Sequence, residues 1–341
     1  MSDREVQITD FLTVQGWAAA AQTLVPGDAS ARRYRRLTHK DGRKAVLMDA
    51  PVNDAAPSDY VQTAKISDGK MVAFTAVSQQ LSMRGFSAPK IYGADIGSGL
   101  LLLEDMGDDL YASVLAATPG VEKPLYEAAV DCLAALYRST FPADINSFGQ
   151  SWTVRDYDPA ALLAETDLLL EWYAPHKGLT LDKAAMQAAW RQAFAVLNSQ
   201  PHGLVLRDFH AENIFWLPER QSVFRVGLID FQDAVMGHPA YDLVSLLEDA
   251  RRKVSVDITD ALITRFCDKA VINDEAGFRT AYAVLGAQRN AKILGIFVRL
   301  AKRDGKDRYL DLLPHVEALF AANLAHPALS KVKDIFDGAG Q

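Results

Sequence analysis

Three oxygen-bearing side chains stand at a spacing that suits phosphoryl transfer. In the segment LVLRDFHAENIFW, residues 204–216, Asp208 and Asn213 are five positions apart, and Asp230 follows later, behind the apolar run VGLI. Phosphoryl transfer requires a carboxylate that accepts the proton of the attacking hydroxyl, and oxygen ligands that hold Mg²⁺ on the phosphates. The spacing therefore predicts Asp208 as the base and Asn213 and Asp230 as metal ligands.

The alternative for these residues is structural. Aspartate and asparagine also cap helices and form turns, and D-x-x-x-x-N occurs by chance in many proteins. Here a second motif, IDFQDAVMGHPAYDL, follows at a suitable distance and in a strand-then-loop context. The pair of motifs matches the catalytic and metal loops of protein-kinase-like enzymes, which favours the catalytic interpretation.

The elements that must position these loops fall into two parts. Near the N-terminus, periodicity and turn residues predict a short helix up to Gly16, a hairpin of strands over 32–38 and 44–50, and a helix over 70–84. From Tyr111 onward helical periodicity dominates, apart from the strand-loop-strand pattern of 204–234. We therefore expect an N-terminal nucleotide-binding domain over 1–106 and a catalytic and substrate-binding domain over 107–341.

Composition and charge exclude several classes of function. The 341 residues carry a formal net charge of −7, which gives no field for attracting nucleic acid. No apolar run approaches the ~18 residues of a membrane span, and the run Trp17–Ala21 is too short for a signal-peptide core. We expect a cytoplasmic protein that binds neither nucleic acid nor membrane, with Cys132 and Cys267 as buried free thiols; no protein partner can be inferred.

The motifs LRDFHAENI and IDFQDAVMGHPAYDL resemble those of the aminoglycoside phosphotransferase and choline kinase-like family, and the resemblance covers most of the chain. It implies an α+β, bilobal protein-kinase-like fold with a small antiparallel β N-lobe and a mostly helical C-lobe. It also implies ATP and Mg²⁺ as cofactors, Asp208 as the base, Asn213 and Asp230 as Mg²⁺ ligands, and Asp242 as a brace of the catalytic loop. Relatives usually carry His-Gly before the base, where this chain has Leu206 and Arg207; Arg207 could brace the loop through a carboxylate such as Asp242.

The segments GDASARRY, LLLEDMGD and QRNAKILGIFVRLAKRDGKDRYL are, more narrowly, similar to those of bacterial N-acetylmuramate/N-acetylglucosamine anomeric kinases of cell-wall recycling. The resemblance implies ATP-dependent phosphorylation of the anomeric hydroxyl of a small-molecule sugar. Two alternatives stay open: a kinase of another small alcohol or an aminoglycoside, and a catalytically silent nucleotide-binding regulator.

The nucleotide side departs from kinase-like enzymes. Backbone groups of Glu104 and Met106 are expected to read the adenine edge. However, Met48 replaces the usual third-strand lysine, and the helix over 70–84 has no acid to hold one. A substitute cation is expected in the run 32–36, where strand alternation places Arg33 and Arg35 on one face and Arg32 and Arg36 on the other.

Alternation does not decide which pair enters the cleft. We select Arg33 and Arg35, together with Ser30 of the GDAS turn, as phosphate-binding candidates; a solvated basic face is the alternative for the whole run.

Four residues are candidates for contact with the acceptor: His210, Asp233, Arg251 and Arg289. His210 could equally bond the loop backbone, and Arg289 could equally form a salt bridge to one of the chain's many acids. N-acetylmuramate differs from N-acetylglucosamine by a lactyl carboxylate, which a bidentate arginine suits. Arg289 is therefore the first candidate for that contact and Arg251 the second.

Overall fold

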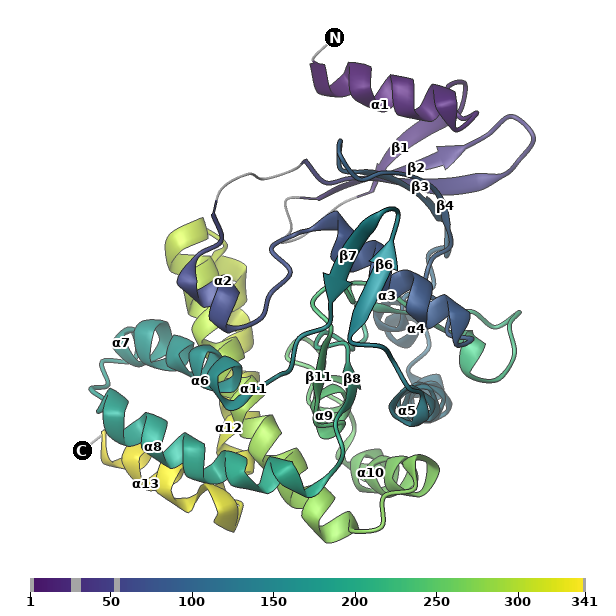
Figure 1. The fold of residues 1–341 in the computed structure, drawn as a ribbon. Coiled ribbons are helices and arrows are strands. Elements are labelled where there is room, and N and C mark those ends of the chain that lie inside the picture. Colours follow the sequence, from purple (N-terminus) through teal and green to yellow (C-terminus); the bar gives the residue numbers. More distant parts are fainter. Residues whose placement is uncertain (1–2, 26–31, 52–55, 340–341) are drawn as a thin grey trace.

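The N-terminal part of the chain is a small antiparallel sheet. The computed structural model describes residues 3–25, 32–51 and 56–339. Five strands pair in the order β1-β2-β3-β5-β4, all antiparallel. Their bounds are Ala21–Val25 (β1), Arg33–Thr38 (β2), Lys44–Asp49 (β3), Ile91–Asp95 (β4) and Leu100–Glu104 (β5). Figure 1 shows this sheet above a larger, mostly helical part, so the predicted α+β class is confirmed.

Strands β2 and β3 form the predicted hairpin. Thr38 pairs with Lys44 at the turn, and Tyr34 pairs with Met48 further along. A backbone bond of 2.9 Å from the N–H of His39 to the carbonyl of Arg43 closes the turn. Gly42 has a φ of 88°, a left-handed conformation that glycine adopts without steric cost.

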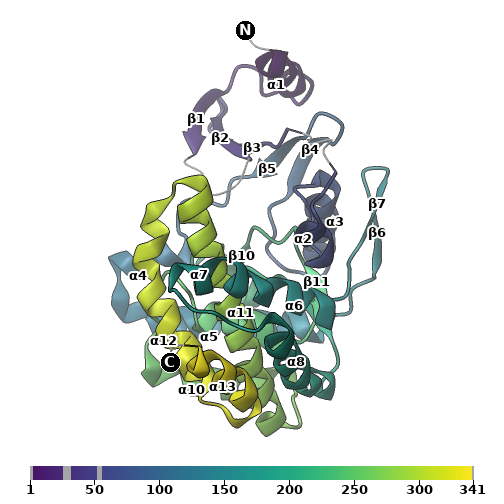
Figure 2. The same ribbon diagram turned by 90° about the vertical axis from the view of Figure 1, so that its left-hand side faces the viewer.

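Each face of the sheet is covered by one helix (Figure 2). Helix α3 (Met71–Met83) matches the predicted helix, and Met48 and Leu101 join it in the main core of the molecule. Helix α1 (Asp3–Val14) covers the outer face through an apolar cluster of Ile8, Phe11, Leu12, Trp17, Ala20, Leu37, Ala45, Leu47, Leu100 and Leu102. Because strand residues alternate between faces, the β2 residues 33, 35 and 37 lie on the α1 side, and 34 and 36 lie on the opposite side.

Helices make up most of the remaining chain, around the 30-residue helix α11. Asp274 accepts a bond of 2.9 Å from the N–H of Gly277 at its start, and Gly305, with a φ of 68°, ends it. Helices α6, α9, α10 and α12 pack against it. The helices are α4 (Tyr111–Ala117), α5 (Glu122–Arg138), α6 (Pro159–Leu168), α7 (Ala174–His176), α8 (Lys183–Ala193), α9 (Ala240–Leu247), α10 (Val256–Ala270), α11 (Glu275–Asp304), α12 (Leu313–Leu324) and α13 (Ser330–Gly338).

Short strands carry the loops that the sequence singled out. The strands are β6 (Asp144–Ser147), β7 (Gln150–Thr153), β8 (Gly203–Val205), β9 (Ile214–Trp216), β10 (Val226–Leu228) and β11 (Val235–Gly237). Strand β9 pairs with β10, and β8 pairs with β11, all antiparallel. The loop 206–213 thus leaves β8 and enters β9, and the loop 229–234 joins β10 to β11, as the strand-loop-strand pattern predicted.

One segment of the N-terminal region lies against the helical part. Helix α2 (Asp59–Thr63) packs on α6. The carbonyl of Ala64 accepts a bond of 2.8 Å from Arg207, and the carbonyl of Ile66 accepts one of 2.8 Å from Arg155. The segment 59–67 therefore connects the sheet to the helical part, which contains the catalytic loop.

The structure bears on two expectations from the sequence, the state of the cysteines and the absence of a membrane span. Cys132 and Cys267 are free and buried, as predicted. Within the described ranges, no helix combines the length and the apolar character needed to cross a bilayer.

The turn before α9 contains a buried histidine that makes stability depend on pH. The Nδ1 atom of His238 accepts a bond of 3.2 Å from the N–H of Ala240, and its ring centre lies 5.8 Å from that of Phe278. Burial lowers the pKa of His238 to about 3. In the unfolded chain a histidine titrates near 6.5, so its contribution to stability is complete above that pH and is lost as the pH falls toward 3.

We predict that His238→Asn, which keeps an acceptor for Ala240, flattens the pH dependence of the free energy of unfolding. Urea titrations at pH 7 and pH 5 measure how much free energy of unfolding is lost between these two pH values. This loss should be smaller by about 1–2 kcal/mol in the variant than in the wild type. The control is His176→Asn, since His176 is exposed. Equal pH dependence in wild type and His238→Asn would contradict the assignment.

Candidate active site

A buried carboxylate on α9 holds the loop that carries the predicted base. The two oxygens of Asp242 accept bonds from the backbone N–H groups of Leu206, at 2.7 Å, and Arg207, at 2.9 Å. Burial raises the pKa of Asp242 to about 7, while these two bonds favour the ionised form. Asp242 thus bonds the backbone of residues 206–207, as expected of a residue that braces the catalytic loop.

Arg207, directly before the base, has an uncommon backbone conformation. Its φ of 73° lies in the left-handed region, which residues with a Cβ rarely adopt. Its guanidinium is 2% exposed, bonds the carboxylate of Glu165 and lies 5.0 Å from the centre of the Tyr157 ring. The carboxylate that meets this side chain is thus Glu165, whereas Asp242 meets only the backbone N–H of Arg207.

Glu165 is the centre of a buried polar cluster between α6 and α11. It accepts bonds from Lys292 Nζ at 2.9 Å, from Gln288 Nε2 at 2.9 Å and from the hydroxyl of Tyr157. Burial would raise the pKa of this carboxyl, but the charges of Lys292 and Arg207 outweigh it and hold the pKa at about 2. Gln288 and Lys292 are therefore bonded to a carboxylate with a structural role.

The three predicted catalytic side chains meet at one point in the cleft. Asn213 Nδ2 lies 3.1 Å from the backbone oxygen of Asp208 and 3.4 Å from Oδ2 of Asp230. The Asp208 carboxylate is half-buried and accepts no hydrogen bond from the described residues. It is the side chain at this point that is open to a new hydrogen-bond donor.

Asp230 is held in a strained conformation beside the base. Its φ is 58°, and its Oδ1 accepts a bond of 2.9 Å from Gln232 Nε2. The partly buried position of Asp230, and then the negative charge of Asp208, raise its pKa. A cation beside both carboxylates would relieve this repulsion.

The donor set fits a hard divalent cation that is shared with phosphates. An amide oxygen and a carboxylate are oxygen ligands, and Mg²⁺ typically takes one or two protein ligands and completes its shell with phosphate and water. Among the described residues, no group of three or more His, Cys, Asp or Glu side chains could hold a metal by itself. Asn213 and Asp230 are the residues that would hold such a cation here.

His210 is buried beneath the loop and neutral. Its Nε2 lies 3.2 Å from Asn213 Nδ2. Burial lowers the pKa of His210 to about 3. The His210 ring thus contacts the side chain of Asn213, and among the described residues no backbone group bonds it, in contrast to the loop-backbone alternative.

The linker after β5 carries the residues predicted to read adenine. The Glu104 carboxylate is bonded to Arg220, at 2.7 Å, and to the N–H of Lys90, at 3.2 Å. The backbone N–H and C=O of Met106 make no hydrogen bond to any described residue. Its Cε would lie 2.7 Å from a Cβ at Gly227, so Gly227 leaves space for the Met106 side chain beneath the linker.

The third-strand position that usually carries a lysine holds an apolar side chain in an apolar environment. Met48 is fully buried in the core cluster that includes Met71, Phe74 and Val77 of α3. No carboxylate of α3 could have balanced a lysine there, since its sequence MVAFTAVSQQLSM lacks acids.

The arginine run is divided between the two faces of the sheet. Arg33 and Arg35 lie on the α1 side, where Arg35 bonds Glu5, and Arg33 is exposed. Arg36 bonds Asp105 and Asp108 of the linker. Arg32, by contrast, reaches the metal-loop carboxylate, with Nη1 3.7 Å from Oδ1 of Asp230. The structure thus brings Arg32, and not the selected pair Arg33 and Arg35, to the catalytic cleft; Ser30 lies outside the described residues.

The acceptor-side candidates differ in accessibility. Asp233 accepts a bond of 2.6 Å from the N–H of Ser67. Arg251 is half-buried, pairs with Glu212 of the catalytic loop at 3.0 Å and lies 6.0 Å from the centre of the Phe297 ring.

Arg289 on α11 is only 4% exposed and its Nη1 has no hydrogen-bond partner in the described chain. It forms no ion pair with any described acid, although its charge acts on Asp242 and Glu248. Because a buried guanidinium normally has an anionic partner, Arg289 is the most conspicuous unpaired charge near the loop.

Sequence reasoning missed the cluster of Glu165, Lys292 and Arg207. The available signal was Glu165 itself, an acid among the apolar residues of PAALLAETDL, but the identity of its partners depends on how α6 and α11 cross. Arg32 was visible in the run 32–36, and only the location of α1 decides that it faces the cleft.

The chain is similar to known phosphotransferases. Residues 21–281 match the phosphotransferase enzyme family. The N-acetylmuramate/N-acetylglucosamine kinase of Caulobacter vibrioides is 38% identical over 98% of this chain and 96% of its own length. The protein of the same name from Pseudomonas aeruginosa is 32% identical over 90% of this chain and 86% of its own length.

Solved structures show the same fold at low sequence identity. A choline/ethanolamine kinase family protein from Mesorhizobium loti superposes with a TM-score of 0.61 at 15% identity, covering 97% of this chain and 98% of its own. A GDP complex of an aminoglycoside 2'-phosphotransferase gives a TM-score of 0.58 at 14% identity, covering 93% of this chain and 99% of its own. With its kinase-like fold and its match over residues 21–281, the chain belongs to the phosphotransferase enzyme family.

Proposed function

We propose that this protein is an ATP-dependent kinase that phosphorylates the anomeric hydroxyl of N-acetylmuramate and N-acetylglucosamine, in the cytoplasm, during cell-wall recycling. One observation carries the catalytic part: the Asp208 carboxylate has no hydrogen-bond partner among the described residues, and it lies on a loop held by Asp242, beside Asn213 and Asp230. The sugar assignment rests on the full-length relatives that bear this name.

The reaction assigns one task to each group of this site. Asp208 orients the sugar hydroxyl and accepts its proton while the sugar oxygen forms a bond to the γ-phosphorus and the bond to the β-phosphate oxygen breaks, which releases ADP. Asn213 and Asp230 would hold Mg²⁺, which neutralises phosphate charge when bound. Arg32 lies beside Asp230 and supplies the positive charge that the absent lysine would have given.

Arg289 is proposed to recognise the lactyl carboxylate of N-acetylmuramate. Its guanidinium lacks an anionic partner in the described chain, and its charge reaches His210 of the catalytic loop. Arg251 is the second candidate, because it is more exposed and lies against Glu212 of the same loop. A substrate carboxylate would give either arginine a charge-assisted contact.

We predict that Asp208→Asn lowers kcat on the order of 10²–10⁴-fold, because it removes a positioned general base. The Kd for ATP, measured by calorimetry, should stay nearly unchanged. Asp10→Asn, an exposed change on α1, serves as the control. Full activity of the Asp208 variant would exclude the base assignment, and inactive wild type would support the silent-regulator alternative.

For the phosphate cation, Arg32→Ala is expected to raise the KM for ATP about 10- to 100-fold, the range for losing a charge-assisted contact. Assays at saturating Mg²⁺ separate this effect from metal binding. Arg33→Ala is the matched control, since Arg33 is exposed on the α1 side of the same strand. A larger effect at Arg33 than at Arg32 would reverse the assignment.

For the acceptor, Arg289→Ala should lower kcat/KM for N-acetylmuramate. The ratio to wild type should correspond to a loss of about 1.5–3 kcal/mol in transition-state stabilisation, and the loss for N-acetylglucosamine should be much smaller. The variant Arg289→Lys tests whether charge alone suffices, and Arg251→Ala tests the second candidate. Equal losses with the two sugars would make Arg289 a structural residue beneath the loop.

A further inference from the structure

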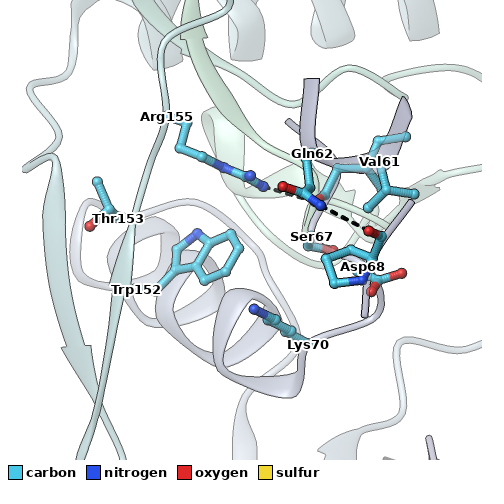
Figure 3. A pocket seen from close by; sticks show the side chains of 10 residues that line it. Val61, Gln62, Ser67, Asp68, Lys70, Trp152, Thr153 and Arg155 are labelled. Atoms are coloured by element: carbon cyan, nitrogen blue, oxygen red, sulfur yellow. Dashed lines mark hydrogen bonds between the residues drawn. The ribbon is translucent and has the colours of Figure 1, made fainter. Parts of the chain in front are cut away.

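A cavity outside the catalytic cleft has the chemistry of a ligand site. It lies between the α2 segment, the start of α3 and the β6–β7 hairpin, and its volume is about 200 Å³. Figure 3 shows Trp152 between Arg155 and Lys70, facing a hollow that Gln62, Ser67 and Asp68 also line. None of the proposed catalytic, metal-binding or phosphate-binding residues lines it.

Two cations at this cavity have no carboxylate partner. Lys70 is exposed, and its side-chain ammonium makes no hydrogen bond or ion pair with the described residues. Arg155 donates to the carbonyl of Ile66 at 2.8 Å and forms no ion pair in the described part of the chain. Burial lowers the pKa of Arg155, so its charge is partly desolvated. Asp68 is the carboxylate among the lining residues, so Lys70 and Arg155 together leave the lining with a net positive charge.

Two buried donors that lack partners in the described chain belong to residues that line the same cavity. Ser67 is 2% exposed, and its hydroxyl has no hydrogen-bond partner among the described residues. The indole N–H of Trp152 also lacks a partner there. Helix α3 begins here at Met71 without a side-chain cap, so its N-terminus adds a positive field that favours an anion.

These groups select one class of ligand. A phosphate group suits Lys70, Arg155 and the start of α3, and the indole ring of Trp152 suits the apolar face of a sugar. The volume is below the roughly 300–1,000 Å³ of sites for drug-sized ligands, which restricts the occupant to a small molecule. We infer that this cavity binds a phosphorylated monosaccharide.

The cavity is connected to the catalytic loops by the segment 64–67. The N–H of Ser67 donates to Asp233, three residues after Asp230, and the carbonyl of Ala64 accepts a bond from Arg207, the neighbour of Asp208. The inference itself concerns binding alone, and it stands or falls independently of the proposed kinase activity.

The experiment measures binding of glucose 6-phosphate and of inorganic phosphate to the full chain by calorimetry and tryptophan fluorescence. ADP and N-acetylglucosamine are present at saturation, to fill the catalytic cleft. We expect one site that prefers the sugar phosphate. Lys70→Ala should weaken it at least about tenfold and Lys70→Glu should abolish it. Trp152→Phe should remove the fluorescence response.

Lys40→Ala, an exposed lysine of the β2–β3 turn, is the matched control and should bind as wild type does. Absence of binding at millimolar concentrations would overturn the inference, and so would equal binding to wild type and Lys70→Glu. Equal affinity for inorganic phosphate and the sugar phosphate would reject the sugar part of the ligand class.

Discussion

The catalytic loop depends on the ion pairs of the buried Glu165 carboxylate. A charge removed from water costs several kcal/mol unless it is paired, and deletion of one partner of a buried pair typically costs about 3–5 kcal/mol. Here Glu165 is balanced by Arg207 from the loop and Lys292 from α11. Because neither cation has another carboxylate in the described chain, α6, α11 and the loop can satisfy their charges in one arrangement only. That arrangement orients the residue next to Asp208.

Backbone strain is present in both loops of the candidate site. Arg207 and Asp230 both have positive φ, which costs on the order of 1–3 kcal/mol for a residue with a Cβ. Each residue is held by a hydrogen bond: Asp242 of α9 fixes the N–H of Arg207, and Gln232 of the same loop fixes the carboxylate of Asp230. Strain held in this way pre-organises the site, since the oxygens are positioned before any ligand arrives. Such conformations are expected only where the surrounding structure over-determines them.

Local patterns predicted most of the fold and the centre of the site. The hairpin over 32–50, the helix over 70–84 and the loops at Asp208 and Asp230 follow from periodicity and turn residues, which act over a few positions. Whether Arg32 or Arg35 faces the cleft depends on which face of the sheet α1 covers, and that is a tertiary fact. The partners of Glu165 and the solitary state of Arg289 likewise depend on how helices far apart in the sequence cross. A pattern identifies a charge in an apolar helix, but only packing identifies its partner.

The exchange of the third-strand lysine for Met48 has a consequence for the cleft. With Met48 buried, β3 contributes only apolar contact to the core beneath it. Arg32, whose side chain is 8% exposed, pairs with Asp230, whose side chain is 43% exposed. This pair balances the charge of Asp230. Under the proposed function, Asp230 would hold Mg²⁺ and Arg32 would meet the phosphates, so each charge would have a partner of opposite sign. A lysine on β3 would find no acid on α3 to balance it, which fits the joint absence of both halves of the usual ion pair.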